Sequence, residues 1–145
     1  MISRGDKSGT HVAEMDLWLK AGIRPAGEWY VVYEKGAAGN GPTLRYTDEQ
    51  GAYTVIDRAT YLSLKKEIKL AILVENDEAM LNFMSLIPVN AARFWRVNGT
   101  SAMQFEYWAT AVDKGQKIIR DFGRKQYGEP LFFPNSDAWR KKTGK

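Results

Sequence analysis

The chain has 145 residues, of which 44% are hydrophobic and 26% charged, so it can form a folded core and does not have the composition of a disordered chain. It has no cysteine and one histidine, His11, which excludes disulfides, thiolate metal sites and histidine-rich metal sites. We expect no membrane insertion, because no apolar run is long enough to cross a bilayer, and we recognise no signal peptide in the chain as given.

The net charge of +4 comes from the C-terminal end of the chain. Residues 140–145 carry four basic side chains and no acidic one, so the rest of the chain is electrically balanced. Basic tails of this kind are usually solvated termini. We therefore expect no specific binding of nucleic acid.

The first helix is predicted over residues 10–21, after a polar opening. Val12, Met15 and Leu19 recur at helical spacing and would share one face. Gly22 follows as a natural C-terminal stop.

Strand-like and helical segments alternate through the middle of the chain. Residues 28–33 are aromatic and β-branched and predict a buried strand. A glycine-rich loop over 34–44 leads to a short helix, and residues 52–56 form another candidate strand. Asp57 is expected to cap a helix that runs to about residue 64.

Two further strands are predicted, at residues 68–74 and 85–89. Pro88 would place the second of these at a sheet edge. Helices that alternate with apolar strands indicate an α/β fold.

The last third of the chain is predicted to be helical. Ser101 and Gln104 have the spacing of a capping box, and an apolar stripe follows them at helical spacing. Asp113 is expected to start a further helix, and residues 128–136 form an extended segment bounded by proline.

The opening stretch, "SRGDKSGTH", has the composition of an oxyanion site. It precedes a helix, whose first N–H groups have no partner within the helix and whose dipole is positive at that end. Ser8, Gly9 and Thr10 would present N–H groups and hydroxyls there, and Arg4 adds a planar, permanently charged fork. Asp6 could hold Arg4 in place, accept a proton from a protonated anion, or repel a fully ionised one.

Other interpretations of this stretch and of two later ones remain open. A capped helix start with a surface Arg–Asp pair explains the same residues without a ligand. Catalysis by His11 lacks an identifiable orienting acid, and the glycines of residues 36–41 lack the Lys-Ser/Thr pair of a P-loop. Three carboxylates in residues 75–78 favour a solvated turn over a metal site.

Four stretches together resemble one protein family. They are "SRGDKSGTH" followed by "LW", "GAYTVIDRATYL" at 51–62, "ILVEND" at 72–77 and "GEPLFFP" at 128–134. Their content and spacing resemble the tungstate-binding proteins of ABC importers, which are type II periplasmic solute-binding proteins with two α/β lobes closing on a tetrahedral oxyanion.

The resemblance implies a non-enzymatic binding protein outside the cytoplasm, in the periplasm, that delivers its ligand to an ABC permease. It implies tungstate or molybdate as ligand and no cofactor or directly coordinated metal. Asp6, His11 and Asp57 would hold the contacting residues in place without touching the anion themselves. The residues implied to contact the anion are Ser3, Arg4, Gly5, Ser8, Gly9 and Thr10.

The chain departs from the family in length. Family members have a first lobe before the matching segment, so residues 1–98 would form the second, oxyanion-binding lobe. Residues 99–145 would be C-terminal helices that return to the first lobe, which another chain or fragment would supply. We expect the chain alone to bind its anion much more weakly than a complete two-lobed protein does, because a half-site leaves the anion facing water. A phosphate-binding module and a non-transport interaction half-domain are the alternatives.

Overall fold

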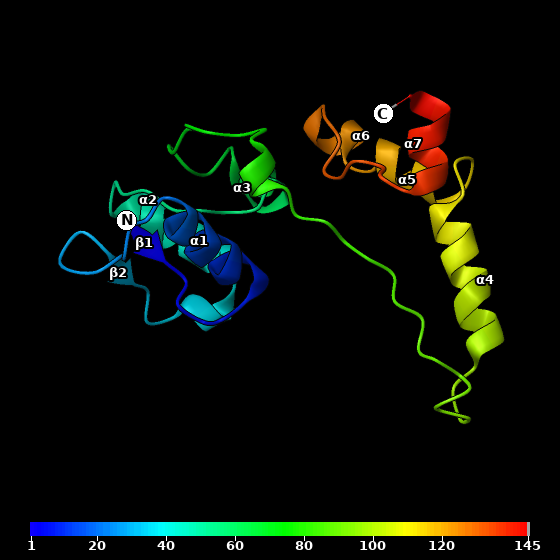
Figure 1. Cartoon of the computed structure of the whole chain (residues 1–145). Coiled ribbons are helices and arrows are strands. Elements are labelled where there is room, and N and C mark those ends of the chain that lie inside the picture. The colour runs from blue at the N-terminus through cyan, green and yellow to red at the C-terminus, as the bar shows by residue number, and fades with distance from the viewer. Residues whose placement is uncertain (145) are drawn as a thin grey trace. The chain divides into compact units, whose positions relative to one another are not determined.

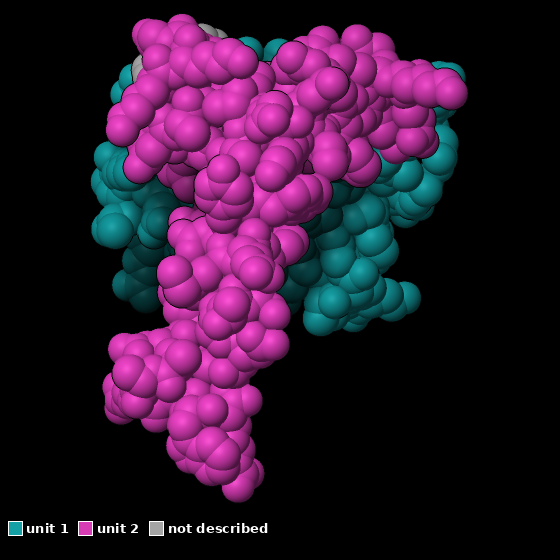
Figure 2. Space-filling view, turned by 90° about the vertical axis from the view of Figure 1, so that its right-hand side faces the viewer, with its two compact units in different colours: residues 1–82 teal, residues 83–145 magenta. Residues whose placement is uncertain are grey.

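The computed structural model describes residues 1–144 and divides into two compact units, one over residues 1–82 and the other from residue 83 onwards (Figure 2). We describe each unit by itself. Unit 1 contains β1 (Ile2–Ser3), α1 (Gly9–Lys20), β2 (Val31–Val32), η1 (Gly36–Ala38), α2 (Asn40–Glu49), α3 (Arg58–Leu64) and η2 (Glu78–Met80) (Figure 1). Unit 2 contains α4 (Gly99–Thr110), α5 (Gly115–Asp121), α6 (Arg124–Tyr127) and α7 (Asp137–Thr143).

The sheet of unit 1 is small and parallel. β1 pairs with β2 in the register Ile2 to Val31 and Ser3 to Val32. The Ile2 N–H also donates to the carbonyl of Tyr53 at 2.7 Å, so the expected strand at 52–56 lies beside β1 through this bond but is not assigned as a strand. The buried strand predicted at 28–33 is wrong in extent and burial, since β2 has two residues and both are exposed.

The core of unit 1 lies where α2 meets β1 and α3. Its buried apolar side chains are Ile2, Leu44, Leu62 and Leu64. α2 is longer than the short helix predicted and begins at Asn40.

α1 lies within one residue of its predicted bounds, but it buries an unexpected face. Val12 is 51% exposed and Leu19 is 79% exposed, whereas Glu14 is 3% exposed. The Glu14 carboxylate accepts hydrogen bonds from the Ser3 hydroxyl at 2.6 Å and from Trp18 Nε1 at 3.1 Å. These two donors offset the cost of burying a charge, so the polar face of α1 can pack on β1.

The helix caps show how far local sequence determines helix starts. Asp57 caps α3 as predicted, accepting from the Thr60 N–H at 2.8 Å. The N-cap of α4 is Asn98, three residues before the cap predicted at Ser101, and its side chain accepts from the Ser101 N–H at 3.0 Å. α5 begins at Gly115 without a side-chain cap, so the cap expected at Asp113 is wrong.

The strands predicted at 68–74 and 85–89 do not form. The second segment is exposed throughout, and the first is exposed apart from the half-buried Ile68 and Leu70. A strand needs a neighbour to satisfy its backbone, and no described segment pairs with either one.

Polar contacts around Gln116, a buried side chain of α5, hold the elements of unit 2 together. Its amide donates to the Ala109 carbonyl at 2.9 Å and accepts from the N–H groups of Asn135 and Ser136 at 3.0 and 3.1 Å. The Ser136 hydroxyl donates to the Thr110 carbonyl at 2.7 Å, and Ser136 caps α7. The tail expected to be solvated is exposed over residues 140–144, and it is helical up to Thr143 as part of α7.

No helix within residues 1–144 is long and apolar enough to span a membrane.

Candidate anion-binding site

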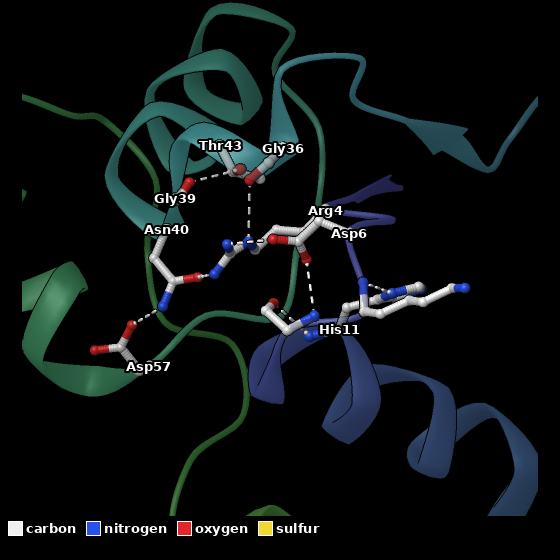
Figure 3. A network of polar contacts seen from close by, with 10 residues as sticks. Arg4, Asp6, His11, Gly36, Gly39, Asn40, Thr43 and Asp57 are labelled. Atoms are coloured by element: carbon white, nitrogen blue, oxygen red, sulfur yellow. Dashed lines mark hydrogen bonds and ion pairs between the residues drawn. The ribbon is translucent and has the colours of Figure 1, made fainter.

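Three acceptors hold the guanidinium of Arg4 (Figure 3). Its Nε donates to the Gly36 carbonyl at 3.3 Å, its Nη1 to Asn40 Oδ1, and its Nη2 to Asp6 Oδ2. The Arg4 side chain is only 11% exposed. A guanidinium has five N–H groups, so one N–H on each Nη remains for a further acceptor.

Asp6 connects Arg4 to the beginning of α1. While its Oδ2 accepts from Arg4, its Oδ1 accepts from the Ser8 N–H at 3.1 Å. The Ser8 hydroxyl, the Ser8 backbone N–H and the Arg4 charge lower the pKa of Asp6. Asp6 is therefore ionised at neutral pH and balances the charge of Arg4.

The first turn of α1 leaves donors unused within the helix. The Ser8 hydroxyl caps the helix by accepting from the His11 N–H at 3.4 Å, and the first main-chain bond runs from Val12 to the Ser8 carbonyl at 2.8 Å. The N–H groups of Gly9 and Thr10 precede these bonds. Gly9 is exposed and Thr10 half-buried, so an anion can reach this turn from solvent.

The loop before α1 depends on two left-handed residues. Gly5 has φ +62°, and a Cβ there would lie 2.2 Å from Val32 Cγ1. Lys7 has φ 61°, and its N–H donates to His11 Nδ1 at 3.0 Å. His11 thus braces the loop through its acceptor nitrogen.

Ser3 is fully buried, and its hydroxyl proton points to Glu14 rather than to solvent. Burial and the nearby Glu14 carboxylate, partly opposed by Ser3, raise the pKa of Tyr30, which therefore stays a neutral phenol beside them. This geometry makes Ser3 a support for the packing of α1 on β1. Arg4, Gly5, Ser8, Gly9 and Thr10 stay the candidates for anion contact from the sequence-based set.

Asn40 is the residue that the sequence analysis missed. Its Oδ1 accepts from Arg4 while its Nδ2 donates to Asp57 Oδ2 at 2.5 Å. The structure therefore brings Asp57 to the site through a residue 17 positions away. The one signal in the sequence is an asparagine where a glycine loop meets a helix, which by itself indicates only a helix start.

The acidic turn after residue 74 has no metal-binding geometry. Glu75 pairs with Arg58 at 2.6 Å, and Asp77 accepts from the Ala79 N–H at 2.8 Å. Within residues 1–144, no group of three or more potential ligands could hold a metal ion. Residues 75–78 are all exposed, as expected of a solvated turn.

Comparison with known proteins defines the class. Residues 1–113 match the family model of the PBP superfamily domain. The chain therefore belongs to the PBP superfamily, in line with the resemblance noted in the sequence.

Individual relatives indicate a narrower group of proteins than the superfamily does. The chain is 44% identical to the tungstate-binding protein TupA of Peptoclostridium acidaminophilum, over 93% of this chain and 46% of that protein. It is 35% identical to TupA of Campylobacter jejuni, over 90% of this chain and 48% of that protein. A crystal structure of the tungstate ABC transporter from Geobacter sulfurreducens aligns with a TM-score of 0.62 and 39% identity, over 83% of this chain and 50% of that one. The chain thus spans about half the length of these relatives.

Proposed function

We propose that this chain is the oxyanion-binding part of the substrate-binding component of an ABC importer, with tungstate or molybdate as its ligand. The observation that carries the proposal is the position of Arg4, which is held by Asp6 against the first turn of α1. The 44% identity to a tungstate-binding protein supports the choice of ligand.

The proposed mechanism is binding by preorganised donors. The two unused N–H groups of Arg4, the N–H groups of Gly9 and Thr10, and the Thr10 hydroxyl would donate to the oxygens of a tetrahedral anion. Because Asp6 neutralises Arg4, affinity would come from aligned dipoles rather than from net charge.

Asp6 also bears on which anion binds. An ionised carboxylate can accept a hydrogen bond from a protonated phosphate but offers nothing to a fully deprotonated tungstate. The lowered pKa of Asp6 keeps it an acceptor at neutral pH. Phosphate is therefore the second candidate ligand.

We propose a binding role rather than a catalytic one, because the proteins matched are named as binding and transport proteins and His11 braces a loop. By the same relation we propose an extracytoplasmic location and an ABC permease as partner.

A first lobe, supplied by another segment or chain, would complete the binding protein. In support, apolar side chains of α4 and the segment before it are exposed, and none of the described residues of unit 2 covers them fully. They include Phe94, Trp95, Met103, Phe105 and Trp108, with exposed fractions of 51%, 80%, 65%, 56% and 42%. A non-transport interaction half-domain would use the same surface.

The test of ligand binding is a thermal-shift and titration series with tungstate, molybdate, sulfate and phosphate. A ligand that binds the folded state stabilises it by about 2.7 kcal/mol at a hundredfold excess over Kd. We expect tungstate or molybdate to raise Tm, and Arg4→Ala to weaken binding about 30-fold through the loss of charge-assisted hydrogen bonds.

Arg45→Ala is the matched control, because Arg45 is an exposed arginine of the same unit and pairs with Glu67 rather than with Asp6. It should leave affinity unchanged. A shift with phosphate alone would replace tungstate by the second candidate. No shift with any of the four anions would contradict the proposal.

A further inference from the structure

Asn40 has a fixed amide orientation that links two elements of unit 1. It is the first residue of α2, and it lies between the cationic Arg4 and the anionic Asp57 (Figure 3). Because its Nδ2 donates to the carboxylate of Asp57, its Oδ1 must face Arg4. The reverse orientation would set the amide NH2 against the guanidinium, with two donors opposed.

Asp57 is itself immobilised at the beginning of α3. Its Oδ1 accepts from the Thr60 N–H at 2.8 Å, and its Oδ2 accepts from the Thr60 hydroxyl at 2.6 Å. A chain of hydrogen bonds therefore runs from the cap of α3 through Asn40 to Arg4. We call these three residues, Asp57, Asn40 and Arg4, the relay.

The relay holds the plane of the guanidinium as well as its position. The Gly36 carbonyl accepts from Nε, Asn40 from Nη1 and Asp6 from Nη2, so three acceptors surround the edge of one planar group. The neutral Asn40 also separates Asp57 from Arg4, so that Asp6 is the acidic side chain, among the described residues, that pairs directly with the cation.

We infer that Asn40, oriented by Asp57, is a positioning residue that sets the plane of Arg4 and thereby the preference among tetrahedral oxyanions. This inference rests on the proposed function. A fixed plane presents its two unused N–H groups at one spacing and angle, which suits anions of one size. A free guanidinium can adjust to large and small anions alike, so losing the relay should lower selectivity as well as affinity.

Two substitutions of Asp57 separate its role in the relay from its role as a cap. Asp57→Ser keeps a good helix N-cap but is too short to reach Asn40. Asp57→Asn can still cap α3 through its oxygen, but its NH2 group then faces the NH2 group of Asn40 and forces that amide to turn. Asn98→Ser, a similar exchange at the cap of α4, is the control for a change of cap alone.

The experiment is titration of the full chain and its variants with tungstate and sulfate, with melting curves to monitor folding. We expect Asn40→Ala, Asp57→Ser and Asp57→Asn each to weaken tungstate binding about tenfold, which corresponds to one hydrogen bond to a charged group, and to weaken sulfate binding less. In an Arg4→Lys background, Asn40→Ala should have less than about a twofold effect, because an ammonium has no plane to orient.

The outcomes distinguish this inference from the proposed function. If the unmodified chain binds neither anion, both fail. If it binds and Arg4→Ala weakens binding, but the relay variants keep the tungstate to sulfate ratio, only the inference fails. An equal effect of Asn40→Ala with Arg4 and with Lys at position 4 would also overturn it, as would an effect of Asn98→Ser matching that of Asp57→Ser.

Discussion

In unit 1, α2, α3 and β1 enclose the apolar side chains Ile2, Leu44, Leu62 and Leu64. In unit 2, the buried residues among those described are Gly115 and Gln116, while large apolar side chains such as Trp95 and Phe105 are exposed. Unit 1 therefore has a small core of its own, whereas the elements of unit 2 are held together mainly by hydrogen bonds and by chain connectivity.

The difference shows what an amphipathic helix does without a partner. The Asn98 cap begins α4, but the apolar side chains of Phe105 and Trp108 stay exposed among the described residues of unit 2. Tertiary packing supplies most of the stability of a helix, so α4 should be far less stable than α2. This agrees with our proposal that a further lobe covers it.

The largest expected effect is a loss of stability in Gly36→Ala, which tests how tightly unit 1 is packed around Arg4. A Cβ on Gly36 would lie 2.0 Å from the carbonyl oxygen of Arg4, so Gly36→Ala must displace backbone. We expect it to lower the free energy of unfolding by about 3 kcal/mol or more, measured by urea denaturation.

Gly41→Ala is the control, since a Cβ on this α2 residue meets only Leu64 Cδ1 at 3.9 Å. It should be neutral or stabilise by about 0.5 kcal/mol, because alanine favours the helix. Equal effects of the two substitutions would show that unit 1 is not closely packed around Arg4.

The next prediction compares the two units directly by hydrogen exchange. Amides of α2 should be protected by at least about 30-fold more than those of α4, because α2 opens only with the core of unit 1. Mass-spectrometric exchange of the full chain measures both helices at once. Similar protection in the two helices would contradict the comparison and indicate that α4 is covered.

The smallest expected effect concerns acid stability. The pKa of Asp6 lies below its ordinary value of 3.8, because of Ser8 and Arg4. A lowered pKa in the folded state contributes stability that is complete above the ordinary value and is lost as pH falls below it. Asp6→Asn should therefore make the free energy of unfolding of unit 1 fall less steeply as the pH is lowered.

Asp121 provides the matched comparison in unit 2. Its pKa is also lowered, chiefly by the hydrogen bond from Arg120, but both side chains are about half exposed. Solvent screens such a pair, so Asp121→Asn should leave the loss of unfolding free energy at low pH almost unchanged. An equal effect of both substitutions on this loss would show that burial of the Arg4–Asp6 pair gives it no advantage.

The sequence by itself determined the features that depend on neighbouring residues. Two such features could be predicted, the position of α1 and the Asp57 cap of α3, because helix hydrogen bonds and caps form within a few residues. The resemblance to tungstate-binding proteins likewise came from contiguous motifs.

The tertiary structure alone decided which partners distant residues find. It turned Ser3 to Glu14 and joined Arg4 to Asp57 through Asn40. It also left the apolar segments 68–74 and 85–89 without strand neighbours within residues 1–144. Strand pairing and side-chain networks join residues far apart in the chain, so their partners depend on how helices and loops pack, which no local pattern encodes.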